Sequence, residues 1–329
     1  MTFKQNHEKT NTQHQIPSKI IHKMVELGCP EFKLSSFEII SGGCANLNLK
    51  IMLEGKTNPL LLRIYLRDKN SAILEQNLYR LLGSKVPVPI IYYVGYIDDY
   101  HFAICQFIQG ITLRDLLLSD VPHNVEAIMK EVGLILAKFS KIEFAEAGFF
   151  DQNLNIIERT SRASYLIFVD QLWQNQFICQ TLNPDIVNKI KDYLDKYGEL
   201  LPNENDKHLV HGDFDPANIL VKQVDGIWKI AAILDWEFAF SGSIIFDVAN
   251  MLRYAHHMPD IFRQSFLEGL KNGGVVLPDN WQITAHLLNL VSLLDVLGRR
   301  DPKTRPNQCA DTLLLINHII NELEIHENN

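Results

Sequence analysis

The stretch His211-Gly212-Asp213-Phe214-Asp215-Pro216-Ala217-Asn218 combines acidic, amide and histidine side chains at a spacing that suits phosphate chemistry. An apolar hairpin pattern follows it, turns at Asp225-Gly226 and leads to Asp235. Phosphoryl transfer requires one carboxylate beside the attacking hydroxyl, and further oxygen ligands that hold magnesium on a triphosphate. The spacing therefore predicts Asp213 as the catalytic carboxylate, which accepts the hydroxyl proton or orients the hydroxyl, and it predicts Asn218 and Asp235 as ligands of Mg²⁺.

Two other interpretations apply to the same residues. Asp and Asn are common turn-capping residues, so Asp213 and Asn218 alone would also fit a structural turn. The following hairpin and Asp235, all in register, favour the chemical interpretation. A hydrolase that used Asp213 with His211 would leave Asn218 and Asp235 without a role. We therefore interpret His211 as a structural residue that holds the loop by hydrogen bonds.

The sequence periodicity changes near Gly110. Before it, strand-like runs alternate with a helical pattern that carries Glu75; the strands are expected at 32–40, 48–53, 60–66, 90–97 and 102–108, and the helix at 71–82. After it, helices are expected at 125–139, 162–180, 184–197, 261–271, 283–297 and 310–324. This order predicts an α+β chain, in which a small antiparallel β lobe packs one helix and a larger lobe is mainly helical. A short amphipathic helix is also expected at 17–27.

From about 37 to 254 the chain resembles the aminoglycoside phosphotransferase family, which groups with choline, ethanolamine and homoserine kinases. The most specific matches are H-G-D-F-D-P-A-N-I-L-V and I-L-D-W-E. The likeness implies a two-lobed, protein-kinase-like fold with ATP in the cleft under the small lobe. We expect a nucleotide-binding lobe over 17–109 and a catalytic, substrate-binding lobe over 110–329, preceded by a tail over 1–16 whose polar composition predicts disorder.

The resemblance also implies a set of nucleotide-binding residues. Arg63 stands where the family places a Lys or Arg on the nucleotide phosphates, and Glu75 would pair with it. A surface arginine on an edge strand is the alternative for Arg63. Gln106 and Ile108 fall in the hinge that would offer backbone groups to adenine.

Two further positions have two interpretations each. Ser41 and Gly42 begin a glycine-containing turn that loosely matches the loop covering the phosphates, and a plain hairpin turn explains it equally well. Asp247 matches a family residue that braces the catalytic loop, but it also fits a carboxylate at a helix N-terminus.

Composition limits the class of protein. The formal net charge of −8 disfavours nucleic-acid binding, which depends on clustered Lys and Arg. No apolar run approaches the ~20 residues of a membrane span, and the N-terminus lacks a signal-peptide pattern. The five cysteines are odd in number and widely spaced, which fits reduced thiols better than disulfides or zinc. We therefore expect a cytoplasmic protein that binds neither nucleic acid nor membrane.

These features together predict an ATP-dependent phosphotransferase, a small-molecule kinase with ATP and Mg²⁺ as cofactors. Gly212 replaces an Arg that many protein kinases carry there, and only eleven residues separate Asp235 from Asp247, too few for a peptide-docking segment. The acceptor is thus a small-molecule hydroxyl, of aminoglycoside type or, alternatively, of choline, ethanolamine or homoserine type. A nucleotide-binding pseudokinase that serves as a regulatory module is the alternative from another class. The oligomeric state stays open.

Groups that bind the acceptor are expected in the helical half. The candidates are acidic, aromatic or histidine side chains: Asp170, Trp173, Asp215, Trp236, Glu237, Tyr254, His257 and Asp295. Carboxylates and aromatic faces favour an amine-bearing acceptor, because both attract cations. Arg299 and Arg300 would instead fit an anionic acceptor.

Overall fold

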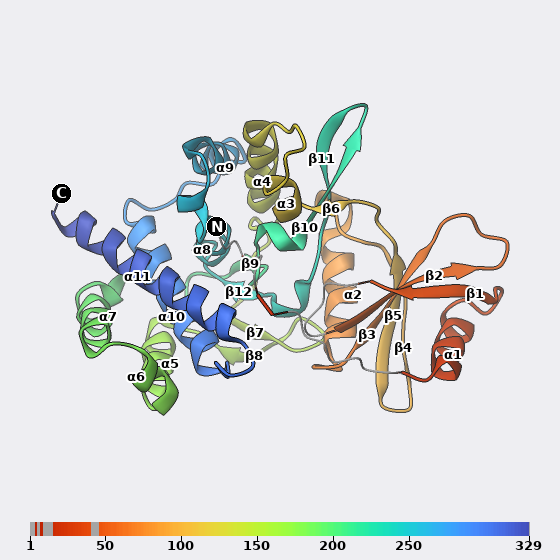
Figure 1. Cartoon of the computed structure of the whole chain (residues 1–329), viewed down its shortest axis with the longest axis horizontal. Coiled ribbons are helices and arrows are strands. Elements are labelled where there is room, and N and C mark those ends of the chain that lie inside the picture. Colours follow the sequence, from red (N-terminus) through yellow and green to blue (C-terminus); the bar gives the residue numbers. More distant parts are fainter. Residues whose placement is uncertain (1–3, 5–6, 9–15, 41–45, 329) are drawn as a thin grey trace.

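The computed structural model describes residues 4, 7–8, 16–40 and 46–328, which form two lobes (Figure 1). The small lobe holds a five-stranded antiparallel sheet in the order β1-β2-β3-β5-β4. Its strands are β1 (Leu34–Ile39), β2 (Asn46–Leu53), β3 (Leu60–Tyr65), β4 (Ile91–Ile97) and β5 (Tyr100–Gln106). Two helices accompany it, α1 (Ser18–Gly28) and α2 (Ser71–Leu82). The α2 range is the one expected from the sequence.

The alternation of side chains along β3 decides what each face of the sheet does. Leu62 and Ile64 are fully buried in a cluster with the apolar side of α1. Arg63 and Tyr65 point to the opposite face, where Glu75 of α2 meets both of them. Side chains alternate between the two faces of a strand. Since Leu62 and Ile64 face α1, Arg63 between them faces α2.

The large lobe is mainly helical. Its helices are α3 (Leu113–Leu117), α4 (Val125–Phe139), α5 (Arg162–Trp173), α6 (Gln176–Thr181), α7 (Pro184–Tyr197), α8 (Ile245–Leu252), α9 (Asp260–Asn272), α10 (Trp281–Gly298) and α11 (Pro306–Asn328). Short strands pair in two sheets, β11-β10-β6 and β8-β7-β12-β9. They are β6 (Ile111–Thr112), β7 (Gly148–Phe150), β8 (Ile156–Arg159), β9 (His208–Val210), β10 (Ile219–Val224), β11 (Ile227–Ile233) and β12 (Phe240–Gly242).

One expected helix, 162–180, is in fact two. Asn175 lies between α5 and α6, and its side-chain oxygen accepts hydrogen bonds from the backbone N–H groups of Phe177 and Ile178. An asparagine that caps a new helix in this way competes with continuation of the preceding helix, so the apolar periodicity alone was misleading here.

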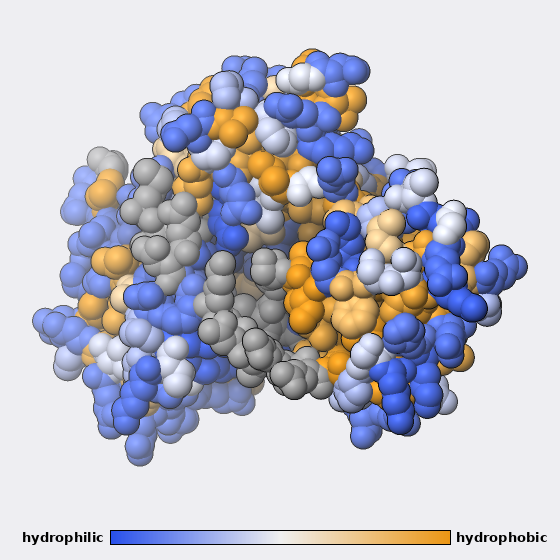
Figure 2. Space-filling model, turned by 45° about the vertical axis from the view of Figure 1, so that its right-hand side comes forward, coloured by the Kyte–Doolittle hydropathy of each residue, from blue (hydrophilic) through white to orange (hydrophobic). Residues whose placement is uncertain are grey.

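The two lobes are joined by residues 107–110. The small sheet ends at Gln106, and the next strand, β6, already pairs with β10 of the large lobe. The expected limits of the tail and the two lobes remain predictions. In the part of the chain that the structure describes, no helix combines the length and the apolarity needed to cross a bilayer. Hydrophobic residues gather on the small-lobe side of the hollow between the lobes (Figure 2).

Candidate active site

The loop after β9 is held by His211, whose side chain is fully buried. Its Nδ1 accepts the backbone N–H of Asp213 at 3.2 Å, so its Nε2 carries the proton and donates to the carbonyl of Leu234 at 2.8 Å. Burial lowers the pKa of His211, which keeps the ring neutral. Both ring nitrogens are therefore engaged in holding the loop to the end of β11, in agreement with a structural role.

Asp247 braces the same loop from the first turn of α8. Its two carboxylate oxygens accept the backbone N–H groups of His211 at 2.7 Å and Gly212 at 3.0 Å. Burial raises the pKa of Asp247 to about 7, although these two hydrogen bonds act in the opposite direction. Asp247 therefore fits both interpretations at once: it is a carboxylate at the N-terminus of a helix, and it braces the loop after β9.

Gly212 is required by this geometry. Its φ of +82° lies in the left-handed region, and a Cβ atom at this position would lie 2.3 Å from the carbonyl oxygen of Phe238. Any side chain there would collide with backbone. The glycine therefore lets the loop pass close to the segment that follows Asp235.

Asp213 and Asn218 are linked directly. The Nδ2 of Asn218 donates to the Asp213 carboxylate at 2.8 Å and to the Asp213 carbonyl at 2.9 Å, which leaves the amide oxygen of Asn218 for another ligand. Asp235 follows β11 with a φ of +59°, and the N–H of Leu234 donates to the Asn218 carbonyl at 2.8 Å. The hairpin thus returns Asp235 to the side of Asn218.

Arg63 connects the two lobes. Its guanidinium pairs with Glu75 at 3.2 Å and with the carboxylate of Asp235, and only 8% of the residue is exposed. The alternative of a surface arginine does not hold, because β3 lies between β2 and β5. Burial raises the pKa of Glu75 to about 7, against the opposing effect of the Arg63 charge, and the Tyr65 hydroxyl donates to Glu75 at 2.6 Å.

A cavity of about 390 Å³ lies between the lobes, and Asn218, Asp235, Arg63 and Glu75 line it. Its apolar walls come from both lobes and include Leu61, Leu82, Val88, Ile91, Leu220 and Ile233. Gln106 and Ile108 also line the cavity, but the backbone N–H of Gln106 already donates to the Ile90 carbonyl at 2.7 Å. Ser41 and Gly42 lie outside the described residues. The other predicted nucleotide and metal residues therefore meet at one cavity.

A profile of the phosphotransferase enzyme family matches residues 36–285, about three quarters of the sequence. The chain belongs to this family. The family resemblance inferred from H-G-D-F-D-P-A-N is thereby confirmed.

Individual relatives are distant. The chain is 27% identical over 173 residues to acyl-CoA dehydrogenase family member 11 from Pongo abelii, a match that covers 51% of this chain and 21% of the relative. It is 24% identical over 183 residues to hygromycin-B 4-O-kinase from Escherichia coli, which covers 54% of this chain and 51% of that enzyme. The matches thus span about a fifth and about half of the lengths of these relatives.

Solved structures share the whole fold. Aminoglycoside phosphotransferase APH(4)-Ia has a TM-score of 0.70 at 18% identity, over 93% of this chain and 99% of that chain. A thermostable mutant of the same enzyme, solved as a ternary complex with AMP-PNP and hygromycin B, has a TM-score of 0.69 at 19% identity, over 92% and 98% of the two chains. The expected two-lobed, kinase-like fold is confirmed.

The expected acceptor residues scatter over the family fold. Trp236 is buried against Phe139, with ring centroids 5.2 Å apart, and Asp295 pairs with Arg299. Asp215, in contrast, lies in the loop after β9, two residues after Asp213, where it accepts the N–H of Ala217 at 2.6 Å.

The half-buried Arg253 and the buried Asp311 were not predicted from the sequence as site residues. Arg253 donates to Asn289 at 2.8 Å and to Asn250, whose own Nδ2 holds the Gly212 carbonyl at 3.1 Å. Asp311 accepts the Tyr254 hydroxyl at 2.5 Å. Neither Arg253 nor Asp311 belongs to a motif, so only their hydrogen-bond partners in the folded chain draw attention to them.

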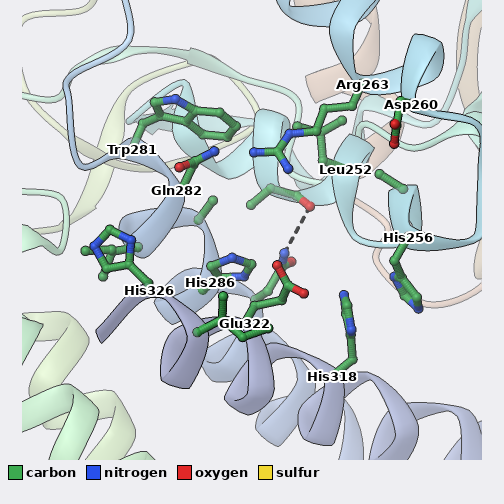
Figure 3. Close-up of a pocket in the computed structure, with 16 residues that line it drawn as sticks. Leu252, His256, Asp260, Arg263, Trp281, Gln282, His286, His318, Glu322 and His326 are labelled. Atoms are coloured by element: carbon green, nitrogen blue, oxygen red, sulfur yellow. Dashed lines mark hydrogen bonds between the residues drawn. The ribbon is translucent and has the colours of Figure 1, made fainter. Parts of the chain in front are cut away.

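A second cavity, of about 320 Å³, lies in the helical lobe, where side chains of α9, α10 and α11 converge (Figure 3). Its polar lining includes Arg263, His286, His318 and Glu322. Among residues 4, 7–8, 16–40 and 46–328, no group of three or more His, Cys, Asp or Glu side chains is arranged to hold a metal ion.

Proposed function

We propose that this chain is an ATP-dependent phosphotransferase that moves the γ-phosphoryl group of Mg-ATP to a hydroxyl of a small molecule. The observation that carries the proposal is the meeting of Arg63, Asn218 and Asp235 at the cavity between the lobes, with Asp213 bonded to Asn218. A cationic group, two oxygen donors and a carboxylate are the parts that phosphoryl transfer needs. The family membership and the fold support the same chemistry.

Asp213 supplies the acceptor side of this reaction. The hydroxyl oxygen of the acceptor forms a bond to the γ-phosphorus, the bond from that phosphorus to the β–γ bridging oxygen breaks, and ADP leaves. The hydroxyl proton passes to the Asp213 carboxylate, or the carboxylate chiefly orients the hydroxyl if the transition state is loose. Asn218 keeps this carboxylate in place through its Nδ2 hydrogen bond.

The residues present fit a magnesium ion. Asp235 offers a carboxylate and Asn218 an amide oxygen, both of them oxygen ligands, and both residues line the same cavity. When bound, Mg²⁺ would neutralise negative charge on the phosphates. We propose Asp235 and Asn218 as its protein ligands.

The remaining nucleotide contacts follow from the lining of the cavity. The apolar walls suit a flat base, and the guanidinium of Arg63 suits phosphate oxygens. Since the N–H of Gln106 is engaged within the sheet, the backbone of Ile108 is the better partner for adenine. Glu75 orients Arg63, whereas Ser41 and Gly42 stay predictions for the loop over the phosphates.

We further propose that the acceptor bears an amine beside its hydroxyl, as an aminoglycoside or an amino alcohol does. Acceptors of choline, ethanolamine or homoserine type stay the alternatives to an aminoglycoside. A nucleotide-binding pseudokinase, which would bind Mg-ATP without turnover, stays the alternative from another class. The cytoplasmic location expected from the cysteines stays a prediction.

An ATP-consumption screen tests the proposed function. Purified protein with Mg-ATP is offered aminoglycosides, amino alcohols, homoserine, sugars and nucleosides, and phosphorylated product is identified by mass spectrometry. We expect turnover of at least one amine-bearing alcohol that is lost in Asp213→Asn. Tight binding of Mg-ATP without any turnover would favour the pseudokinase instead.

A further inference from the structure

The side chain of Lys4, near the N-terminus, contacts the loop that carries Asp213. The Lys4 ammonium pairs with the carboxylate of Asp215, across 211 positions of sequence. The Asp215 side chain is only 9% exposed, whereas 25% of the Lys4 side chain is exposed. The charge of Asp213 also acts on Lys4. An ammonium group therefore stands within the field of the catalytic carboxylate.

Two more residues of the same segment contact the large lobe, so the Lys4 contact is not isolated. The Nε2 of His7 lies 2.9 Å from the carboxylate of Asp311. The carboxylate of Glu8 accepts the backbone N–H groups of Asn307 at 2.6 Å and Gln308 at 3.3 Å, in the first turn of α11. A carboxylate at a helix N-terminus is a favourable contact.

We propose that Asp215 is the ammonium-binding subsite of the acceptor pocket, and that Lys4 occupies it as an internal competitor of the acceptor. The competition rests on the proposed phosphotransferase function, whereas the pairing of Lys4 with Asp215 does not. An acceptor ammonium on Asp215 would place a neighbouring hydroxyl near Asp213, two residues away in the same loop. Lys4 itself carries no hydroxyl, so it fills the subsite without reacting.

The charges around Asp215 favour a replaceable cation there. A carboxylate this deeply buried is costly without a positive partner. The charge of Arg253 also acts on Asp215, but this guanidinium is anchored by Asn250 and Asn289 of the large lobe. Lys4, on a long side chain and partly exposed, is the partner that an incoming ammonium can displace.

Amine labelling tests the pairing of Lys4 with Asp215 without any turnover. The full chain is treated with a limiting amount of acetic anhydride, and acetylation of each lysine is followed by mass spectrometry. We expect Lys4 to react about fivefold more slowly than Lys19, an exposed lysine of α1. In Asp215→Asn this difference should disappear. Equal rates in the unmodified chain would overturn the pairing of Lys4 with Asp215.

Steady-state kinetics test the competition, with ethanolamine, choline and hygromycin B as acceptors. Lys4→Gln should lower the KM for a turned-over cationic acceptor about fivefold and leave kcat and the KM for ATP unchanged, because an occupied subsite reduces apparent affinity. Lys19→Gln, the matched control, should change neither. An unchanged or raised acceptor KM in Lys4→Gln would overturn the internal competitor. If no acceptor of the wider screen is turned over, the phosphotransferase proposal fails, while the labelling result still decides whether Lys4 pairs with Asp215.

Discussion

Asp213 is the residue on which the proposed chemistry depends most directly. Asp213→Ala should lower kcat by a factor of ~10² to 10⁴, the usual effect of removing a general base. Affinity for Mg-ATP should persist, because Arg63, Asn218 and Asp235 remain at the cavity. Initial rates and calorimetric titration measure the two quantities.

Asp225→Asn is a suitable control for this experiment. Asp225 lies at the tip of the β10–β11 hairpin with a φ of +51°, a conformation that Asn also tolerates. The control should keep full activity. If Asp213→Ala turned over substrate as fast as the control, Asp213 would not be the catalytic carboxylate.

Glu75 should give stability an unusual dependence on pH. Its pKa is about 7 in the folded chain, against an ordinary value of 4.5, so between these values the folded state holds a proton that the unfolded state has lost. Its contribution to the free energy of unfolding therefore falls as the pH rises through this window, by at most about 1.4 kcal/mol per pH unit.

Glu75→Gln lacks this titration and isolates its effect. The variant should gain stability relative to the natural chain as the pH rises from 4.5 to about 7, measured by urea unfolding at intervals of pH. Glu38→Gln, at an exposed glutamate of β1, is the matched control. A stability difference for Glu75→Gln that stays constant with pH would contradict the raised pKa.

At the scale of elements, the loop after β9 and the helix α8 act as one unit. Asp247→Asn should lower the free energy of unfolding by about 1–3 kcal/mol, because its NH2 group replaces one of the two accepting oxygens and leaves one backbone N–H unsatisfied. The turnover number should fall as well, since the loop carries Asp213. Denaturant unfolding and initial rates measure both effects.

Asp260→Asn is the control that distinguishes the hydrogen bonds of Asp247 to the loop from its interaction with the helix dipole. Asp260 is an exposed carboxylate in the first turn of α9, so it shares the dipole interaction of Asp247 but braces no catalytic loop. We expect a change of less than about 1 kcal/mol and full activity. Equal losses in the two variants would show that Asp247 acts only as a helix N-terminal charge.

At the scale of the whole molecule, the cavity proposed for the nucleotide is lined by both lobes, and Arg63 of the small sheet already reaches Asp235 of the large lobe. Mg-ATP should therefore stabilise the folded chain, by ~2.7 kcal/mol at 100 times its dissociation constant. Thermal unfolding with and without Mg-ATP measures this shift. Asp235→Ala should show a much smaller shift, since it lacks a proposed ligand, and an equal shift would place the metal elsewhere.

The sequence by itself determined the family and the two-lobed fold, and it predicted a set of candidate chemical groups, because the motifs that indicate them depend on local spacing. The interval between Asp213 and Asn218, and the hairpin that leads to Asp235, lie within a short stretch of chain. Long helices such as α4 and α7 repeat their apolar face often enough to be recognised over their full ranges. Strands of three residues, such as β9 and β12, are too short for any periodicity to appear.

Only the tertiary structure decided the contacts between distant segments. Asp247 reaches backbone N–H groups 35 and 36 positions away, Arg63 reaches Asp235 across 172, and Lys4 reaches Asp215 across 211. No local pattern encodes such partners, since they depend on which faces the packed lobes bring together. The physical reason is that a buried charge must find an opposite charge or hydrogen-bond donors wherever the fold supplies them.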